Sequence, residues 1–229
     1  MVKFICKHNL AYNFFMNIIW HGQSCFQIVS SQSKNGQVNI VIDPFDDSFG
    51  LRAPKLEADI LLITRKDWEH SGEKNISGNP FIIDGPGEYE TKEVFVEGIP
   101  IPSAGKEKSF DTIYTIESEE IKICHLGFLG EKELSDDQVE KIGETDILMI
   151  PVGGLDTISA KEAIKIMSQI EPKITIPMYY QIPKLKAKLD GVDKFLKEMG
   201  VKRVESIPKL SIKKKNIASD EAKIIILNA

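Results

Sequence analysis

Titratable side chains crowd the loop that follows a short apolar run at residues 59–64. The loop carries Arg65, Asp67, Glu69 and His70 within six positions. Carboxylates and imidazoles at such close spacing serve as metal ligands and as general acids and bases in hydrolytic sites. The apolar run before them predicts a strand buried on both faces, and catalytic groups are often carried by a loop that such a strand holds in place. The loop is therefore the first candidate for a functional site.

The arginine in this loop limits the chemistry that the loop can do. A guanidinium has no lone pair to give to a metal and it stays charged. A hydrolytic metal centre needs neutral imidazoles and carboxylates that converge on one or two ions and leave a position for water. We therefore expect Arg65 or Lys66 to form an ion pair with Asp67 or Glu69. A second interpretation keeps Asp67, Glu69 and His70 as a weak site for a hard cation.

Six further segments follow one another between residues 20 and 180. They are W-H-G-Q-S-C-F (20–26), V-I-D-P-F (41–45), I-D-G-P-G-E-Y (83–89), H-L-G-F-L-G (125–130), I-P-V-G-G (150–154) and I-P-M-Y-Y (176–180). Together with the loop, which is similar to T-H-x-H-x-D-H, they resemble the metallo-β-lactamase superfamily, in the branch of L-ascorbate-6-phosphate lactonase and related Zn-dependent hydrolases. The resemblance implies an αββα sandwich fold and a hydrolase that uses Zn or Mn.

The loop itself departs from the pattern of this family. Arg65 and Asp67 stand where the family has its two loop histidines, and Glu69 stands where it has an aspartate. His70 is the one position of the motif that is kept. The resemblance therefore implies that most of the metal ligands of this loop are absent.

Three positions outside the loop depart from the family pattern as well. Gln23 replaces a histidine of this branch, Phe128 replaces the aspartate that bridges the metals, and Tyr179 replaces another histidine. We expect these three residues to lie around the same pocket as the loop. Two aromatic rings there would fill the space that an ion and its water occupy in the family.

Several functions are compatible with this pattern. The first hypothesis is a non-catalytic binding or assembly module without a metal cofactor, in which a salt-bridged loop takes the place of the ion. The second is a metal-dependent hydrolase of a small, lactone-like or phosphorylated substrate with an altered metal site. A third makes the pocket a site for an anionic small molecule, held by Arg65, Lys66 and Gln23. A weaker fourth is a metal-free enzyme that uses Asp67, Glu69 or His70.

Composition narrows the class of protein. The chain has 229 residues, 42% of them hydrophobic and 28% charged, which is typical of one globular domain. With 29 Lys and Arg against 34 Asp and Glu, its formal charge of −5 argues against a nucleic-acid-binding protein. The three cysteines are scattered, which predicts reduced thiols in the cytoplasm. There is no apolar run of the roughly 20 residues that a membrane helix needs.

The pattern of strands and helices agrees with a two-sheet sandwich. Strands dominate the first half of the sequence, and strands alternate with helices after it. Capping and apolar periodicity predict helices at 135–142, 159–171 and 191–199, and late strands are expected at 201–205, 210–213 and 223–227. We expect residues 16–229 to form a single domain and residues 1–15 to be an N-terminal extension. Two interpretations of residues 1–15 stay open: an upstream extension before a native start at Met16, or a short N-terminal arm of a chain that starts at Met1.

Overall fold

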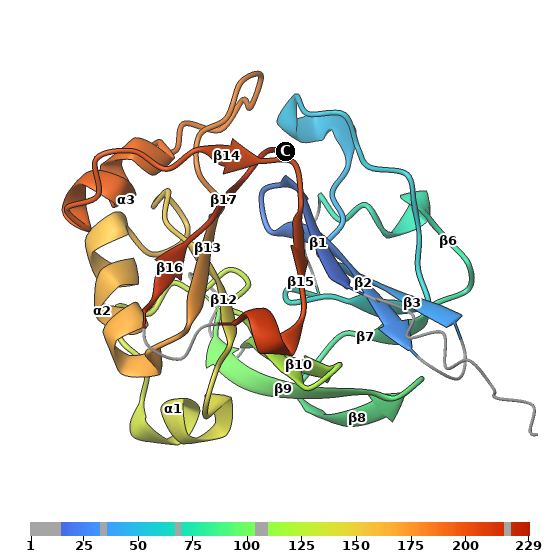
Figure 1. The fold of residues 1–229 in the computed structure, drawn as a ribbon. Helices are drawn as coiled ribbons and strands as arrows, with labels where there is room; N and C mark the ends of the chain where they lie inside the picture. Colours follow the sequence, from blue (N-terminus) through green and yellow to red (C-terminus); the bar gives the residue numbers. More distant parts are fainter. Residues whose placement is uncertain (1–14, 33–35, 67–69, 104–109, 218–220) are drawn as a thin grey trace, which may run out of the picture.

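Two β-sheets packed face to face form the centre of the molecule. The structure is a computed structural model that describes residues 15–32, 36–66, 70–103, 110–217 and 221–229. Figure 1 shows the two sheets, with the α-helices outside one of them. The two-sheet sandwich that the sequence predicts is therefore confirmed. Residues 1–14, most of the expected N-terminal extension, lie outside the described residues.

The first sheet has six strands in the order β15-β1-β2-β3-β5-β7. Their bounds are β1 Met16–Gly22, β2 Cys25–Gln32, β3 Gly36–Ile42, β5 Ile60–Leu62, β7 Phe81–Ile83 and β15 Leu210–Ile212. Strands β1 and β2 pair antiparallel and form a hairpin. Strand β5 pairs parallel with β3 on one side and with β7 on the other, and all three of its residues are buried. The central apolar run is thus a doubly covered strand, as predicted.

The second sheet has seven strands in the order β16-β13-β12-β11-β10-β9-β8. Their bounds are β8 Gly87–Thr91, β9 Val94–Pro102, β10 Phe110–Ser118, β11 Ile121–His125, β12 Ile147–Pro151, β13 Ile174–Met178 and β16 Lys223–Ile224. Two short ribbons complete the strands: β4 Leu56–Glu57 with β6 Ile76–Ser77, and β14 Ser206–Ile207 with β17 Ile226–Leu227. The facing sides of the two sheets supply most of the hydrophobic core.

The helices begin where the sequence predicts caps. The α-helices are α1 Asp136–Ile142, α2 Ala160–Ile170 and α3 Val192–Glu198, and the 3₁₀ turns are η1 Asp47–Phe49, η2 Glu73–Asn75 and η3 Lys214–Asn216. In both capping boxes the side chain three residues on accepts a hydrogen bond from the capping residue, from Ser135 N–H to Gln138 Oε1 and from Ser159 N–H to Glu162 Oε2.

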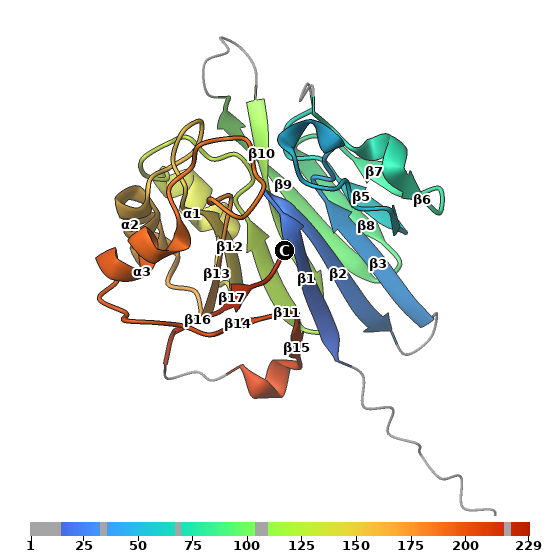
Figure 2. The ribbon, with the colours of Figure 1, turned by 90° about the horizontal axis from the view of Figure 1, so that it is seen from above.

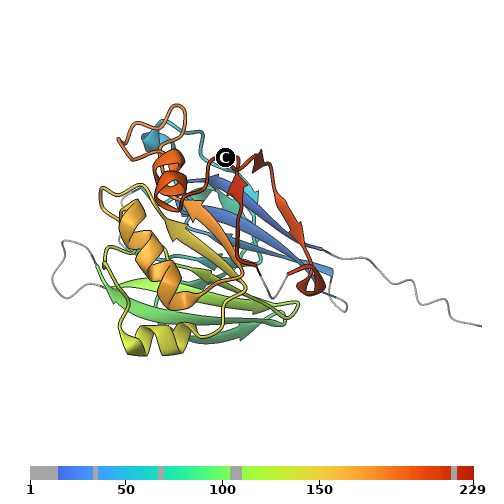
Figure 3. The same ribbon diagram turned by 60° about the vertical axis from the view of Figure 1, so that its left-hand side comes forward.

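The two outer faces of the sandwich are covered differently. Figures 2 and 3 show α1, α2 and α3 together on the outer side of the seven-stranded sheet. On the outer side of the six-stranded sheet, a small cluster that includes Val41, Leu61 and Ile63 packs against Leu56 and Ile76 of the β4–β6 ribbon. This is an αββα arrangement with one outer layer reduced, because the described part of the turn-rich segment between β5 and β7 forms only η2 and β6.

Two details of the predicted strands are wrong. Residues 201–205 do not form a strand: Val201 and Val204 pack against the core from a loop, and β14 begins at Ser206. Packing of two apolar side chains against the core does not by itself create a strand, because a strand also needs a hydrogen-bonded partner. The predicted strand at 223–227 is split at Ile225, since β16 pairs with β13 and β17 pairs with β14.

Candidate functional site

The two sheets are tied together where β5 ends and β10 begins. The backbone N–H of Thr112 donates to the carbonyl of Thr64 over 2.8 Å. The hydroxyl of Tyr114 donates to the carbonyls of Ile63 and Ile83, each over 3.1 Å. Burial raises the pKa of Tyr114 far above its ordinary value, so this hydroxyl stays a donor. These bonds place the loop after Thr64 directly beside the first residues of β10.

Arg65 pairs with Asp111, which lies on β10. Its Nε lies 3.1 and 3.0 Å from the two carboxylate oxygens, and its Nη2 lies 2.6 Å from Oδ2. The hydroxyl of Ser103 donates to Oδ1 of the same carboxylate over 2.8 Å. The side chain of Asp111 is 2% exposed and that of Arg65 is 18% exposed. The guanidinium is therefore held by a nearly buried, bidentate ion pair that crosses from one sheet to the other.

Phe128 and Tyr179 complete a cluster with this ion pair. The guanidinium carbon of Arg65 lies 4.4 Å above the centre of the Phe128 ring, a cation–π contact. The ring of Phe128 meets that of Tyr179 edge to face, with centroids 5.5 Å apart. Both aromatic residues are buried. Phe128 thus contacts both Arg65 and Tyr179 in the structure.

Backbone contacts hold Tyr179 at the end of β13. Its φ of 51° is in the left-handed region, and its N–H donates to the carbonyl of Gln23 over 3.1 Å. Burial raises the pKa of the Tyr179 phenol to about 12; the charge of Asp156 adds to the shift and that of Arg65 opposes it. The phenol therefore stays protonated at neutral pH and acts as a neutral part of the cluster.

Gly153 lies against the backbone that carries Tyr179, which leads to a test. A Cβ on Gly153 would lie 2.3 Å from the Tyr179 carbonyl oxygen, whereas a Cβ on Gly85 would meet nothing within 4 Å. Because backbone would have to move, we expect Gly153→Ala to lower the free energy of unfolding by about 2 to 3 kcal/mol. Gly85→Ala is the matched control, with an expected change within about 0.5 kcal/mol. Urea denaturation of the two variants checks this, and equal effects would contradict the packing argument.

Gln23 joins the site through its backbone. Its carbonyl accepts hydrogen bonds from Tyr179 N–H and from the indole N–H of Trp20, the latter over 2.9 Å. The side chain is 1% exposed, and neither amide atom has a hydrogen-bond partner among the described residues. Gln23 therefore contacts Tyr179 through the main chain.

Two other described residues of the loop, Lys66 and His70, contact other parts of the molecule. Nδ1 of His70 lies 2.9 Å from the hydroxyl of Ser48, and the His70 ring meets Phe49 edge to face at 4.9 Å. Lys66 pairs with Asp84 over 2.7 Å at an exposed position. The predicted partners Asp67 and Glu69 lie outside the described residues.

Sequence reasoning missed Asp111 and Ser103. Asp111 is 46 residues from Arg65 along the chain and stands in no motif. Its only signal is a lone carboxylate among the apolar and β-branched residues that open a strand. Such a carboxylate in a buried strand calls for a cationic partner, but nothing in the sequence indicates which cation provides it.

Two buried titratable residues, Asp43 and His125, lie close in sequence or in space to the residues of this cluster. The Asp43 carboxylate accepts hydrogen bonds from Thr64 N–H over 2.8 Å and Thr64 Oγ1 over 2.6 Å. Burial nevertheless raises the pKa of Asp43 to about 7, because these bonds only partly offset the loss of hydration. His125 is buried, with Nε2 3.0 Å from the Ser24 carbonyl and Nδ1 accepting from Gly127 N–H over 3.1 Å. Burial lowers the pKa of His125 to about 4, so it is a neutral histidine in the core.

The described residues do not fit a metal ion. Among them, no group of three His, Cys, Asp or Glu side chains is placed to hold one. At the loop, the position beside Phe128 and Asp111 is taken by a guanidinium, which cannot be a ligand. The two described cysteines, Cys25 and Cys124, are free and buried, and burial raises the pKa of each thiol.

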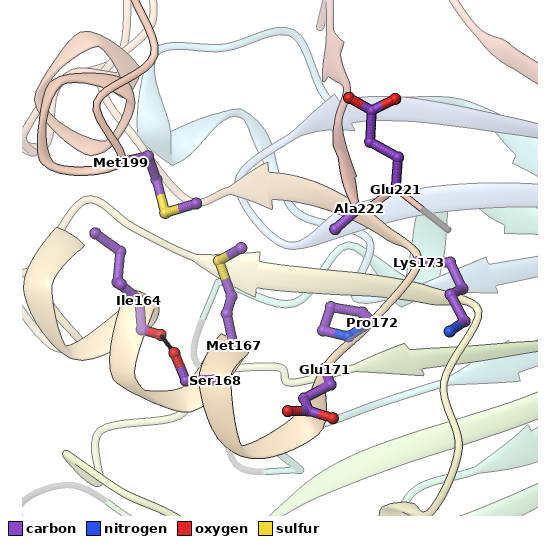
Figure 4. Close-up of a pocket in the computed structure, with 9 residues that line it drawn as sticks. All are labelled: Ile164, Met167, Ser168, Glu171, Pro172, Lys173, Met199, Glu221 and Ala222. Atoms are coloured by element: carbon purple, nitrogen blue, oxygen red, sulfur yellow. Dashed lines mark hydrogen bonds between the residues drawn. The ribbon is translucent and has the colours of Figure 1, made fainter. Parts of the chain in front are cut away.

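A separate hollow of about 360 Å³ lies on the helical side of the molecule. Figure 4 shows that Met167 and Met199 extend into it from α2 and the end of α3. Its rim carries both signs of charge, from Glu171, Glu221 and Lys173. The hydroxyl of Ser168 is already used, since it donates to the Ile164 carbonyl over 3.1 Å. The described structure gives this hollow no selectivity for one class of ligand.

Comparison with known proteins identifies the relatives of this chain. Residues 17–179 match the family model described as a beta-lactamase superfamily domain. The chain is 30% identical over 187 residues to a UPF0173 protein of Pyrococcus abyssi, covering 72% of this chain and 83% of that protein. It is 26% identical over 200 residues to a UPF0173 metal-dependent hydrolase of Thermoplasma volcanium, with the same coverage.

A solved structure shows the same fold over nearly the full length of both chains. It is a crystal structure from Thermotoga maritima of a protein assigned to the metallo-β-lactamase superfamily. The two chains share 32% sequence identity with a TM-score of 0.74, and the match covers 93% of this chain and 98% of the other. Within the described ranges, none of the helices has the length and apolarity to span a bilayer.

Proposed function

This chain belongs to the metallo-β-lactamase superfamily, and its relatives include proteins named as metal-dependent hydrolases. We propose that this chain is a member of the superfamily that works without a metal centre. It acts in the cytoplasm as a non-catalytic binding or assembly module. The fold is kept for the shape and surface that it presents, and the chemistry of the family is absent.

The observation that carries this proposal is the ion pair between Arg65 and Asp111. In a hydrolytic site of this family the loop after β5 presents imidazoles to an ion. In this chain the same loop presents a guanidinium whose charge is already balanced by a buried carboxylate. Phe128 covers the guanidinium and Tyr179 supports Phe128. A metal ion brought to this point would meet a fixed positive charge, which repels it, and aromatic rings that have no lone-pair donor to coordinate it.

The same contacts weigh against an anion site at Arg65. Its guanidinium already makes a bidentate pair, and Lys66 is paired with Asp84. An anionic ligand would have to displace a carboxylate in each case. A ligand-binding role for this protein is therefore better sought elsewhere on its surface.

The alternative is a metal-dependent hydrolase with an altered site. The names of several relatives support it, and so does the loop motif, in which His70 is kept beside Asp67 and Glu69. Such a site would use hard oxygen ligands and a single imidazole. The substrate would be small and lactone-like or phosphorylated, as the resemblance to the lactonase branch implies.

Metal analysis separates the two functions. If the proposal is correct, the purified full-length protein, dialysed after incubation with Zn²⁺, Mn²⁺ or Fe²⁺, holds less than about 0.1 equivalent of each metal. About one equivalent of any of these metals that survives dialysis, and that is lost in His70→Ala, would overturn the proposal in favour of the hydrolase. His21→Ala is the matched control, because His21 lies outside the loop.

A further inference from the structure

Strand β7 is an exposed edge of the sandwich. Among the described residues, the six-stranded sheet ends at β15 and β7, and the seven-stranded sheet ends at β16 and β8. The free main-chain groups of an edge can pair with another chain, so edge strands usually carry charged or polar side chains at their exposed positions. The exposed side chains of β8 are Glu88 and Glu90, and those of β15 and β16 are Ser211 and Lys223. Strand β7 differs from these three.

The exposed side chains of β7 are large and apolar. Phe81 is 50% exposed and Ile82 is 51% exposed. Ile82 is in register with Leu61, so it lies on the outer face of the sheet, beside the small cluster that contains Leu61 and Val41. Phe81 lies on the opposite face, which is also the face of the buried Ile83. This edge therefore presents an apolar side chain on each face, where an edge that stays in water would carry a charge.

The main chain of Ile82 points towards the free side of β7. The N–H of Phe81 donates to the Asp59 carbonyl, and the carbonyl of Ile83 accepts from Ile63 N–H, each over 2.9 Å. In a parallel ladder, alternate residues of a strand bond to the same neighbouring strand. Since the residues on either side of Ile82 bond to the β5 side, its own N–H and C=O both face away from β5. One donor and one acceptor on a single residue are thus available to another strand.

These free groups fit a second copy of the same strand. In an antiparallel pair, residues that face each other at every second position exchange both of their hydrogen bonds. A two-fold axis at Ile82 makes the two copies of Ile82 face each other, so the donor and the acceptor of each copy are satisfied by the other. Such self-complementary contacts generate two-fold dimers, the commonest homo-oligomers.

The register that this axis sets has no like charges opposite each other. Phe81 of each copy faces Ile83 of the other, so apolar side chains meet across the strands, and Asp84 faces Pro80. The charge of Asp84 is balanced by Lys66 of its own chain. The exposed glutamates of β8 would repel their counterparts if the second sheet paired in the same way, so the contact is confined to β7 and the outer face beside it.

We propose that β7 is the interface of a symmetric homodimer, in which it pairs antiparallel with β7 of a second copy of this chain. The inference deepens the assembly role proposed above, and rests on it, by giving the module a partner. The strand does not include residues 65–70, on which the metal question depends. Three paired residues and the side chains beside them make a small interface, so we expect a dissociation constant of about 1 to 100 μM.

Sedimentation equilibrium of the full-length protein tests the dimer. Between about 1 and 500 μM the unmodified protein should pass from monomer to dimer. Ile82→Lys places a charge in the apolar contact, and Ile82→Pro removes the N–H but stays apolar, so each should raise the dissociation constant at least about tenfold. Leu155→Lys is the matched control, because Leu155 is 67% exposed and follows β12, which is not an edge strand. Its dissociation constant should equal that of the unmodified protein, and circular dichroism checks that each variant is folded.

A crosslink tests the register of the two strands. Residues that face each other as a hydrogen-bonded antiparallel pair have Cα atoms about 5.5 Å apart, within the range of a disulfide. Ile82→Cys, made together with Cys6→Ser, should therefore form a covalent dimer under mild oxidation, since the other two cysteines are buried. Leu155→Cys in the same background is the control and should form none.

Several results would overturn the proposal. They are an unmodified protein that is monomeric at about 500 μM, a folded Ile82→Lys or Ile82→Pro that dimerises as strongly as Leu155→Lys, or equal crosslinking of Ile82→Cys and Leu155→Cys. Protein that dimerises through β7 but retains metal through His70 would refute the metal-free proposal alone. Metal-free protein that stays monomeric would refute this inference alone.

Discussion

Asp111→Ala is expected to lower the free energy of unfolding by about 3 to 5 kcal/mol, the cost of removing one partner from a buried ion pair. The Asp111 side chain is 2% exposed, and its loss leaves the Arg65 guanidinium without its carboxylate at a position where water reaches it poorly. The hydroxyl of Ser103 loses its acceptor in the same variant. Urea denaturation at neutral pH measures the change.

Asp84→Ala is the matched control for this experiment. Asp84 also pairs with a basic residue of the loop, but its side chain is 46% exposed and that of Lys66 is 67% exposed. Exposed pairs contribute little, so we expect a change within about 1 kcal/mol. The double variant Arg65→Met/Asp111→Leu should recover most of the stability that Asp111→Ala loses, because it removes both charges together. Equal costs for Asp111→Ala and Asp84→Ala would show that the pair is not the structural tie described above.

The pH dependence of stability is expected to contain two opposing contributions of similar size. The pKa of Asp43 is raised to about 7, so the folded protein keeps a proton that the unfolded chain releases above pH 4. Its contribution is present at low pH and is lost as the pH rises to about 7. The pKa of His125 is lowered to about 4, so its contribution is present above pH 6.5 and is lost as the pH falls towards 4. At roughly 1.4 kcal/mol per pKa unit, each is on the order of 3 to 5 kcal/mol.

Single substitutions should separate the two contributions. Urea unfolding at about pH 4.5, 5.5, 6.5 and 7.5 gives the free energy for each variant. Relative to the unmodified protein, Asp43→Asn should gain stability as the pH rises, because only the His125 contribution remains. His125→Asn should lose stability over the same range. The differences between curves are the readout, since exposed carboxylates contribute equally to all three proteins. Parallel curves would mean that neither group titrates as its burial requires.

Much of the fold could be predicted from the sequence because local signals and burial agree. The hairpin of β1 and β2, the doubly buried β5 and the capping boxes of α1 and α2 each follow from spacing within a few residues. Residues 201–205 show where this reasoning fails. Their apolar side chains indicate burial correctly, but the strand assignment depended on a partner that only the tertiary structure could supply.

In the candidate site, too, some contacts could be predicted from the sequence and others could not. The meeting of Arg65, Phe128 and Tyr179 could be predicted, because each stands in a segment that resembles a family motif. The partner of Arg65 could not be predicted, because an ion pair between two sheets depends on how they pack. The direction of His70, towards Ser48 and Phe49, was also unpredictable, since local loop geometry decides it. The roles of Asp67 and Glu69 stay predictions.

The two outer layers of the sandwich differ in thickness, and this difference determines which side of the molecule unfolds locally at the lowest cost in free energy. The half built on β12 and β13 is shielded by helices, whereas the small cluster around Val41 and Leu61 has only a short ribbon over it. Partial opening therefore costs least on the ribbon side, and that side carries β5, which is followed by the loop with Arg65. The ion pair between Arg65 and Asp111 connects this less covered sheet to the seven-stranded sheet, so losing it would make local opening on the ribbon side easier.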